Sequence, residues 1–107
     1  MRLEKSVYDL VVATVADYER MNRMVVQGGL PPDQMVVFVR KISAIDHALT
    51  VVCDGEREEV KRALLSDIAE RRGYDRSRSK ELFGSRKLFY ARKGQAVHFI
   101  ARMMDLI

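Results

Sequence analysis

The spacing of large apolar residues between positions 35 and 52 constrains the fold most. A helix turns once in about 3.6 residues, so residues three and four apart share one face. The region predicts one long helix that starts at Pro32, whose missing N–H is no loss at the first helical position. The apolar residues recur at alternating intervals of three and four: Met35, Phe38, Ile42, Ile45, Leu49 and Val52.

Such a stripe needs a partner helix. Two partners fit the pattern: the chain's own first helix, or the same helix of a second chain in a homodimer. A short connection normally joins antiparallel neighbours, so internal packing is the favoured interpretation. Residues 1–53 are therefore predicted to form a helical hairpin with a capacity for oligomerisation.

The rest of the chain has the same helical spacing. Residues 3–26 predict a first helix that ends at the glycines of 27–29. A third helix is expected at about 56–71, a short one at 77–83 and a last one at 86–105. Strand-like alternation never extends beyond a few residues; "MVVFV" at 35–39 lies inside the helical pattern. The prediction is an all-α bundle of about five helices.

Length and composition fit one soluble domain. The chain has 107 residues, 48% of them hydrophobic and 32% charged. Its single cysteine, Cys53, cannot form an internal disulfide, which is typical of a reducing compartment. No apolar run approaches the roughly 18 residues of a membrane span. We expect one cytoplasmic domain over residues 1–107 with no membrane association.

Positive charge is concentrated in residues 71–93. This segment holds nine cations and two acids, a net charge of +7, whereas the remaining residues hold ten cations and thirteen acids, a net charge of −3. A local positive field attracts polyanions, and nucleic acid is the foremost of these.

The stretch 84–93, "GSRKLFYARK", mixes four cations with three large apolar side chains. A helix capped by Ser85 resolves the mixture, because Leu88 and Phe89 can face the core while Arg86, Lys87 and Lys93 face outward. With the short helix before it, this helix forms a predicted helix-turn-helix over the 54–107 region. Cations at a helix N-terminus are mildly unfavourable, so a facing phosphate would remove a penalty.

The same region resembles a known family. The pattern of residues 85–93, followed by "AVHFIA" at 96–101, is similar to the C-terminal helix-turn-helix of phage late-gene transcription activators of the ArpU/RinA type, which are similar to sigma factor region 4. "FVRKISAIDHAL" at 38–49 and "DYERM" at 17–21 resemble their upstream helices, whereas Leu88 and Ala91 depart from the pattern. The matching residues are Ser85, Phe89, Tyr90, Arg92, Lys93, Ile100 and Ala101.

This resemblance implies a regulator of transcription, derived from a phage or prophage, that binds double-stranded DNA. It implies that Ser85, Arg86, Lys87 and Tyr90 face bases or phosphates. Arg86 is the candidate for a bidentate guanine contact. Physical reasoning assigns a second set to the DNA backbone, where contacts position a protein without reading sequence. These are Arg76, Arg78, Lys80, Arg92 and Lys93.

The sequence contains no pattern of an enzyme or a metal site. His47, His98 and Cys53 have no partners at metal-ligand spacing, and no phosphate-binding glycine loop is present. We therefore expect no catalysis, no metal and no cofactor. Two alternatives to a DNA-binding regulator remain open. One is an adaptor that binds RNA polymerase or another phage protein, and the other is a small terminase subunit.

Overall fold

The structure, a computed structural model, describes residues 2–78 and 83–107. These residues form an all-α fold with no strand among them, which confirms the predicted fold class. None of the described helices combines the length and the apolarity that a bilayer crossing requires. The elements are α1 (Lys5–Ala16), α2 (Tyr18–Gln27), α3 (Pro32–Val52), α4 (Glu58–Ala69), the 3₁₀ helix η1 (Tyr74–Arg76) and α6 (Arg86–Met103).

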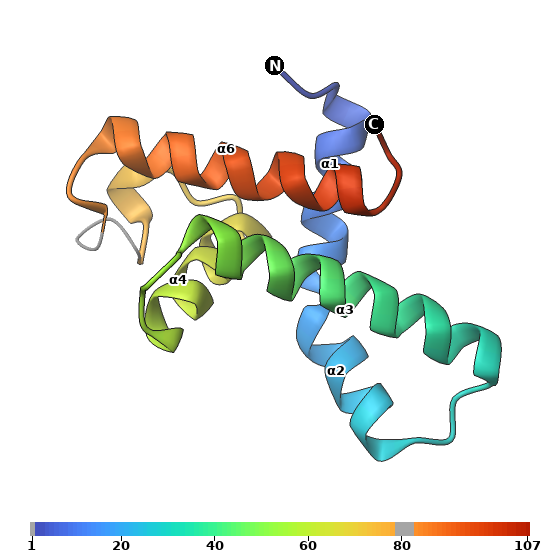
Figure 1. Cartoon of the computed structure of the whole chain (residues 1–107). Helices are drawn as coiled ribbons and strands as arrows, with labels where there is room; N and C mark the ends of the chain where they lie inside the picture. The colour runs from blue at the N-terminus through green and yellow to red at the C-terminus, as the bar shows by residue number, and fades with distance from the viewer. Residues whose placement is uncertain (1, 79–82) are drawn as a thin grey trace.

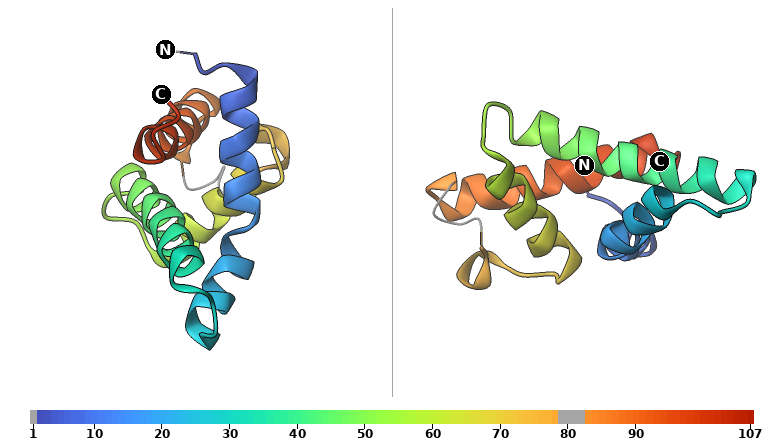
Figure 2. Two further views of the ribbon diagram at one scale, coloured as in Figure 1. Left: turned by 90° about the vertical axis from the view of Figure 1, so that its right-hand side faces the viewer. Right: turned by 90° about the horizontal axis from the view of Figure 1, so that it is seen from below.

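Helices α3 and α6 lie side by side in opposite directions and form the centre of the fold (Figure 1). Helix α1 crosses α6 and packs on α4, whereas α2 follows the first half of α3 (Figure 2). The α2–α3 hairpin projects from the rest of the molecule, and η1 packs beside the start of α6. The start of α6 and the tip of the hairpin therefore lie at opposite ends (Figure 1).

One hydrophobic core joins α1, α3, α4 and α6. Its members come from segments far apart in the sequence, so burial of their apolar surface holds the four helices together. The largest fully buried apolar side chains include Val11, Val15, Ile45, Leu64, Ile68, Phe89 and Ile100.

The first predicted helix is bent in two, so the prediction of one helix over 3–26 is wrong. Helix α1 ends at Ala16, and α2 begins at Tyr18 after Asp17. The hydroxyl of Thr14 donates to the carbonyl of Leu10 at 2.8 Å, a bond that often bends helices. The bend lets α1 cross α6 while α2 follows α3.

The second predicted helix is confirmed. Helix α3 begins at Pro32, and α2 ends at Gln27 before Gly28, whose φ of 77° suits glycine. The C-terminal half of its apolar stripe is buried in the chain's own core through Ile45 and Leu49. Internal packing therefore accounts for this half of the stripe, but α3 packs on α6 as well as on α2, so the first predicted helix is not its only partner.

The region after α3 departs from the prediction in detail. Helix α4, expected at about 56–71, begins at Glu58 after Arg57 and ends at Ala69. The predicted helix at 77–83 falls largely on residues 79–82, which lie outside the described residues. Before that gap, Ser77 has extended backbone and the helical turn lies earlier, at η1. The described residues thus do not establish the predicted helix-turn-helix.

Candidate nucleic-acid interface

Helix α6 begins with the predicted cap. The backbone N–H of Leu88 donates to Ser85 Oγ at 3.1 Å, and the N–H of Phe89 donates to the Ser85 carbonyl at 3.0 Å. Ser85 has extended backbone, as a residue before a helix should. The Ser85 hydroxyl therefore accepts the hydrogen bond that caps α6. Its contact with DNA stays a prediction.

The 3₁₀ helix η1 is fastened to the first turns of α6. Arg86 Nη2 donates to Asp75 Oδ1 at 2.9 Å, and its guanidinium lies 5.0 Å from the ring centroid of Tyr74. The N–H of Tyr74 donates to the hydroxyl of Tyr90 at 3.1 Å. Space beside Gly73 is tight, because a Cβ there would lie 3.0 Å from the Tyr90 hydroxyl. We call η1, residues 77–78 and residues 84–90 the basic end.

An aromatic cluster supports the basic end from inside. Phe89 is fully buried, and the rings of Tyr74, Phe83 and Tyr90 surround it at centroid distances of 5.8, 6.4 and 5.1 Å. Packed rings have few alternative rotamers, so this cluster orients the first turn of α6. It explains why Phe89 stands among cations in the sequence.

A buried carboxylate, which the sequence reasoning missed, fixes the connection from α4. Asp67 is fully buried and accepts from Arg72 Nε at 2.8 Å, Ser77 Oγ at 2.7 Å and the Arg78 N–H at 2.9 Å. The signal was present: an acid lies beside the apolar stripe of α4, between Leu64 and Ile68, and a run of cations follows it. Asp67 thus determines where Ser77 and Arg78 lie.

The predicted outward position of Lys93 is wrong. Its side chain is buried, and Nζ donates to the carbonyl of Arg72 at 2.9 Å. Nζ also lies 5.9 Å from the ring centroid of Phe89. Burial lowers the pKa of Lys93, and the carboxylate of Asp67 partly offsets that effect. Lys93 is a structural cation in this fold and is not positioned to reach a phosphate.

Leu88 departs from prediction in the opposite sense, since it is 39% exposed instead of buried. Tyr90 is 46% exposed, so one part of its ring faces solvent although its hydroxyl is bonded to Tyr74. The first turns of α6 therefore present both an aliphatic and an aromatic surface beside the cations.

Of the nine cations of residues 71–93, the structure gives seven, all but Arg92 and Lys80, one of two environments. Four are bonded within the fold: Arg71 to Asp9, Arg72 to Asp67 and Glu70, Arg86 to Asp75, and Lys93 to the Arg72 carbonyl. The side chains of Arg76, Arg78 and Lys87 are exposed and make no ion pair with any described residue. Lys80 lies outside the described residues.

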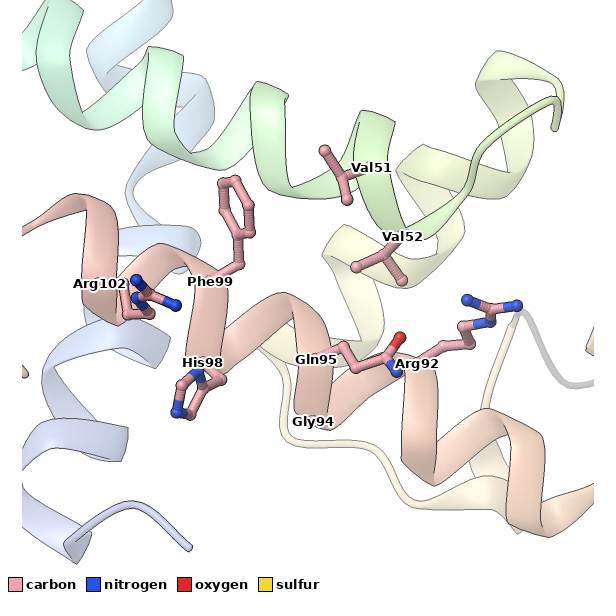
Figure 3. A pocket seen from close by; sticks show the side chains of 8 residues that line it. All are labelled: Val51, Val52, Arg92, Gly94, Gln95, His98, Phe99 and Arg102. Carbon is pink, nitrogen blue, oxygen red and sulfur yellow. The ribbon is translucent and has the colours of Figure 1, made fainter. Parts of the chain in front are cut away.

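Arg92 is half-buried and lines a pocket between α3 and α6, with Val52 on the facing helix (Figure 3). Helix α6 has no acid in its first turn, so Arg86 and Lys87 meet the positive end of the helix dipole without compensation from within that turn. The basic end therefore combines the dipole with exposed cations.

The other candidate groups show structural roles. Among the described residues, no group of His, Cys, Asp and Glu could hold a metal ion. His47 stacks on Phe99 at 5.4 Å between ring centroids, and burial raises the pKa of the Cys53 thiol. Comparison with protein-family models, curated proteins and solved structures finds no match to this chain. The function must therefore be argued from the chain's own geometry.

Proposed function

We propose that this protein binds double-stranded DNA through the basic end and acts as a transcription regulator. One observation carries the proposal: Arg76, Arg78 and Lys87 are exposed, make no ion pair with a described residue, and belong to η1, to the segment after it and to the capped first turn of α6, against which η1 packs. Unpaired cations that meet a helix N-terminus form a surface suited to phosphate. The resemblance to phage activators of the ArpU/RinA type agrees with this function and suggests a phage or prophage origin.

The contacts of Arg86 support a role in reading bases. Its ion pair with Asp75 is exposed on both sides, and an exposed pair is worth only about 0–1 kcal/mol. The exchange of Asp75 for a guanine edge or a phosphate therefore costs little. The Tyr74 ring beneath the guanidinium limits its orientations before DNA arrives. Arg86 is thus held near the surface in a restricted geometry.

The remaining cations divide by position. Arg76 ends η1, and Arg78 lies two residues after it, in the segment that leads towards α6. This position suits contacts to the sugar-phosphate backbone. Lys87 lies beside Arg86 in the first turn of α6. If this helix docks in a groove, the Lys87 ammonium would reach a base edge or a phosphate. Lys93 has no part in this interface, because its ammonium is bonded inside the fold.

The test compares Lys87→Gln and the double variant Arg76→Gln/Arg78→Gln with the parent protein. Binding to labelled duplex DNA from upstream regions is measured by fluorescence anisotropy. We expect several-fold weaker binding for Lys87→Gln and a larger loss for the double variant, with unfolding midpoints unchanged.

Arg23→Gln is the matched control, since Arg23 is an exposed cation on α2, away from the basic end. It should bind DNA as the parent does. Equal binding by the parent, Lys87→Gln and the double variant would exclude the basic end as the interface.

A second candidate function is a protein-interaction adaptor, and exposed valines favour it. Val26, Val36, Val37 and Val39 are exposed on the α2–α3 hairpin, with Val36 67% exposed. Grouped apolar residues at a surface often mark an interaction site. The partner would be RNA polymerase, another phage protein or further copies of this chain, as in a small terminase subunit. Light scattering tests the last case, because a ring-sized oligomer would favour the terminase function.

A further inference from the structure

An open pocket lies between the end of α3 and the middle of α6, outside the basic end. Its volume is about 580 Å³. Val51 and Val52 form one wall, and Arg92, Gln95, Phe99 and Arg102 of α6 form the other (Figure 3). We call the apolar side chains of Val51, Val52 and Phe99 the floor of the pocket. Arg92 lies towards one end of this floor and Arg102 towards the other (Figure 3).

The α6 wall of this pocket has helical regularity. Arg92, Gln95, Phe99 and Arg102 follow one another at intervals of three, four and three residues, which is the spacing of a helix-packing face. At a rise of about 1.5 Å per residue, the two arginines lie roughly 15 Å apart along the helix axis. A third helix of about three turns therefore matches the length of this face.

The two arginines that line the pocket give it a positive charge at each end. No Asp or Glu lines it, and neither Arg92 nor Arg102 makes an ion pair with a described residue. The floor is aliphatic and aromatic, through Val51, Val52 and Phe99. Such a surface suits an occupant that is apolar along one face and negative at its ends, and a sugar-phosphate backbone lacks the apolar face.

We infer that this pocket is a docking groove for an acidic amphipathic helix of a partner protein. The helix would lay its apolar residues on Val51, Val52 and Phe99 and place a carboxylate on each of Arg92 and Arg102. This is helix-in-groove recognition with charge selection at the two ends.

The groove does not depend on DNA binding. Arg92 follows Lys87 by five residues, which places it roughly 140° around the helix. Lys87, Arg76 and Arg78 do not line the groove, so a partner helix there would leave Lys87 on a different side of α6. This chain would then join DNA to an acidic partner.

The probe is a fluorescein-labelled helical peptide with two leucines between two glutamates, at the spacing of the groove. Its matched control has glutamines in place of both glutamates. We expect the glutamate peptide to bind the full chain at least about tenfold more tightly than the glutamine peptide, the equivalent of about 1.4 kcal/mol. The double variant Arg92→Gln/Arg102→Gln should remove this difference, and Arg23→Gln should keep it.

A second pair of variants tests the floor of the groove. Val51 and Val36 are both exposed valines on α3, and only Val51 lines the pocket. Val51→Glu should weaken binding of the glutamate peptide about tenfold by charge repulsion, while Val36→Glu should not change it.

Three results would overturn the inference. The first is equal affinity for the two peptides, or no binding of either at about 1 mM. The second is loss of DNA binding in Arg92→Gln/Arg102→Gln to the extent seen for Lys87→Gln, which would assign the groove to nucleic acid. The third is a dimer of the chain that Val51→Glu dissociates, which would make a second copy the occupant.

Discussion

Lys87 and Lys93 show how position decides the role of identical side chains. They lie six residues apart on α6, yet Lys87 is exposed whereas Lys93 is bonded to the Arg72 carbonyl inside the fold. Residue type and helical spacing were compatible with either outcome for Lys93. Its burial results from the path of residues 70–73, which the Asp67 contacts fix.

Gly94 is a residue whose replacement should stabilise the protein. It lies within α6, and a Cβ at this position would have no neighbour within 4 Å. Glycine inside a helix costs about 1 kcal/mol relative to alanine. We expect Gly94→Ala to raise the free energy of unfolding by about 0.5–1 kcal/mol in urea titrations. Gly28→Ala is the contrasting variant and should destabilise, since Gly28 has a φ of 77°.

At the scale of elements, Tyr18 joins the start of α2 to the middle of α3. Its hydroxyl donates to Asp46 Oδ1 at 2.5 Å. Burial, followed by the hydrogen bond and charge of Asp46, raises the pKa of Tyr18 above its ordinary value of 10.0. The stability that this contact gives to the α2–α3 hairpin therefore depends on pH.

The sign of this coupling gives a prediction. Below pH 10 the hydroxyl is protonated in both states and its contribution is fully present; above pH 10 the unfolded chain ionises first, so stability falls as pH rises. Tyr18→Phe should lose about 1 kcal/mol at neutral pH and show a shallower alkaline decline. Urea unfolding at a series of alkaline pH values measures both effects. Parallel pH profiles for parent and variant would contradict the assignment.

Asp67 joins α4 to the segment that leads into the basic end. Removal of one partner from a buried ion pair typically costs about 3–5 kcal/mol. We expect Asp67→Ala to destabilise the chain by this amount in urea unfolding, because it removes the buried acceptor that Arg72 Nε, Ser77 Oγ and the Arg78 N–H share. Asp75→Ala is the control, since its ion pair with Arg86 is exposed and its loss should change stability little.

At the scale of the whole molecule, the basic end and the exposed valines of the α2–α3 hairpin are separated. The molecule measures 44 × 29 × 22 Å, with the basic end and the tip of the α2–α3 hairpin at opposite ends (Figure 1). The proposed DNA surface and the exposed valines of the hairpin can therefore be occupied at once. Because of this separation, the effect of a mutation on binding at one end can be measured without altering the surface at the other end.

The salt dependence of DNA binding tests the proposed interface as a unit. Four cations, Arg76, Arg78, Arg86 and Lys87, would contact DNA. Each neutralised phosphate adds about −0.9 to the slope of log K against log salt, so we expect a slope of roughly −3 to −4. Lys87→Gln should reduce its magnitude by about one. A slope near zero in anisotropy titrations would contradict a phosphate-dominated interface.

Local chemistry was enough to predict α3, α6 and several helix ends. Apolar spacing indicated α3 and α6, Pro32 and Ser85 marked their starts, and Gly28 follows the end of α2. These features depend on residues within a few positions of one another, so they can be read without knowledge of the fold. The concentration of cations at 71–93 was equally plain from the sequence.

Contacts between distant segments settled the rest. The bend at Asp17 follows from the need of α1 and α2 to pack on different helices, and a buried carboxylate at Asp67 holds Ser77 and Arg78 in place. The same contacts buried Lys93, exposed Leu88 and put Arg92 in the α3–α6 groove. Burial and pairing depend on which segments meet in space, and helical periodicity carries no information about that meeting.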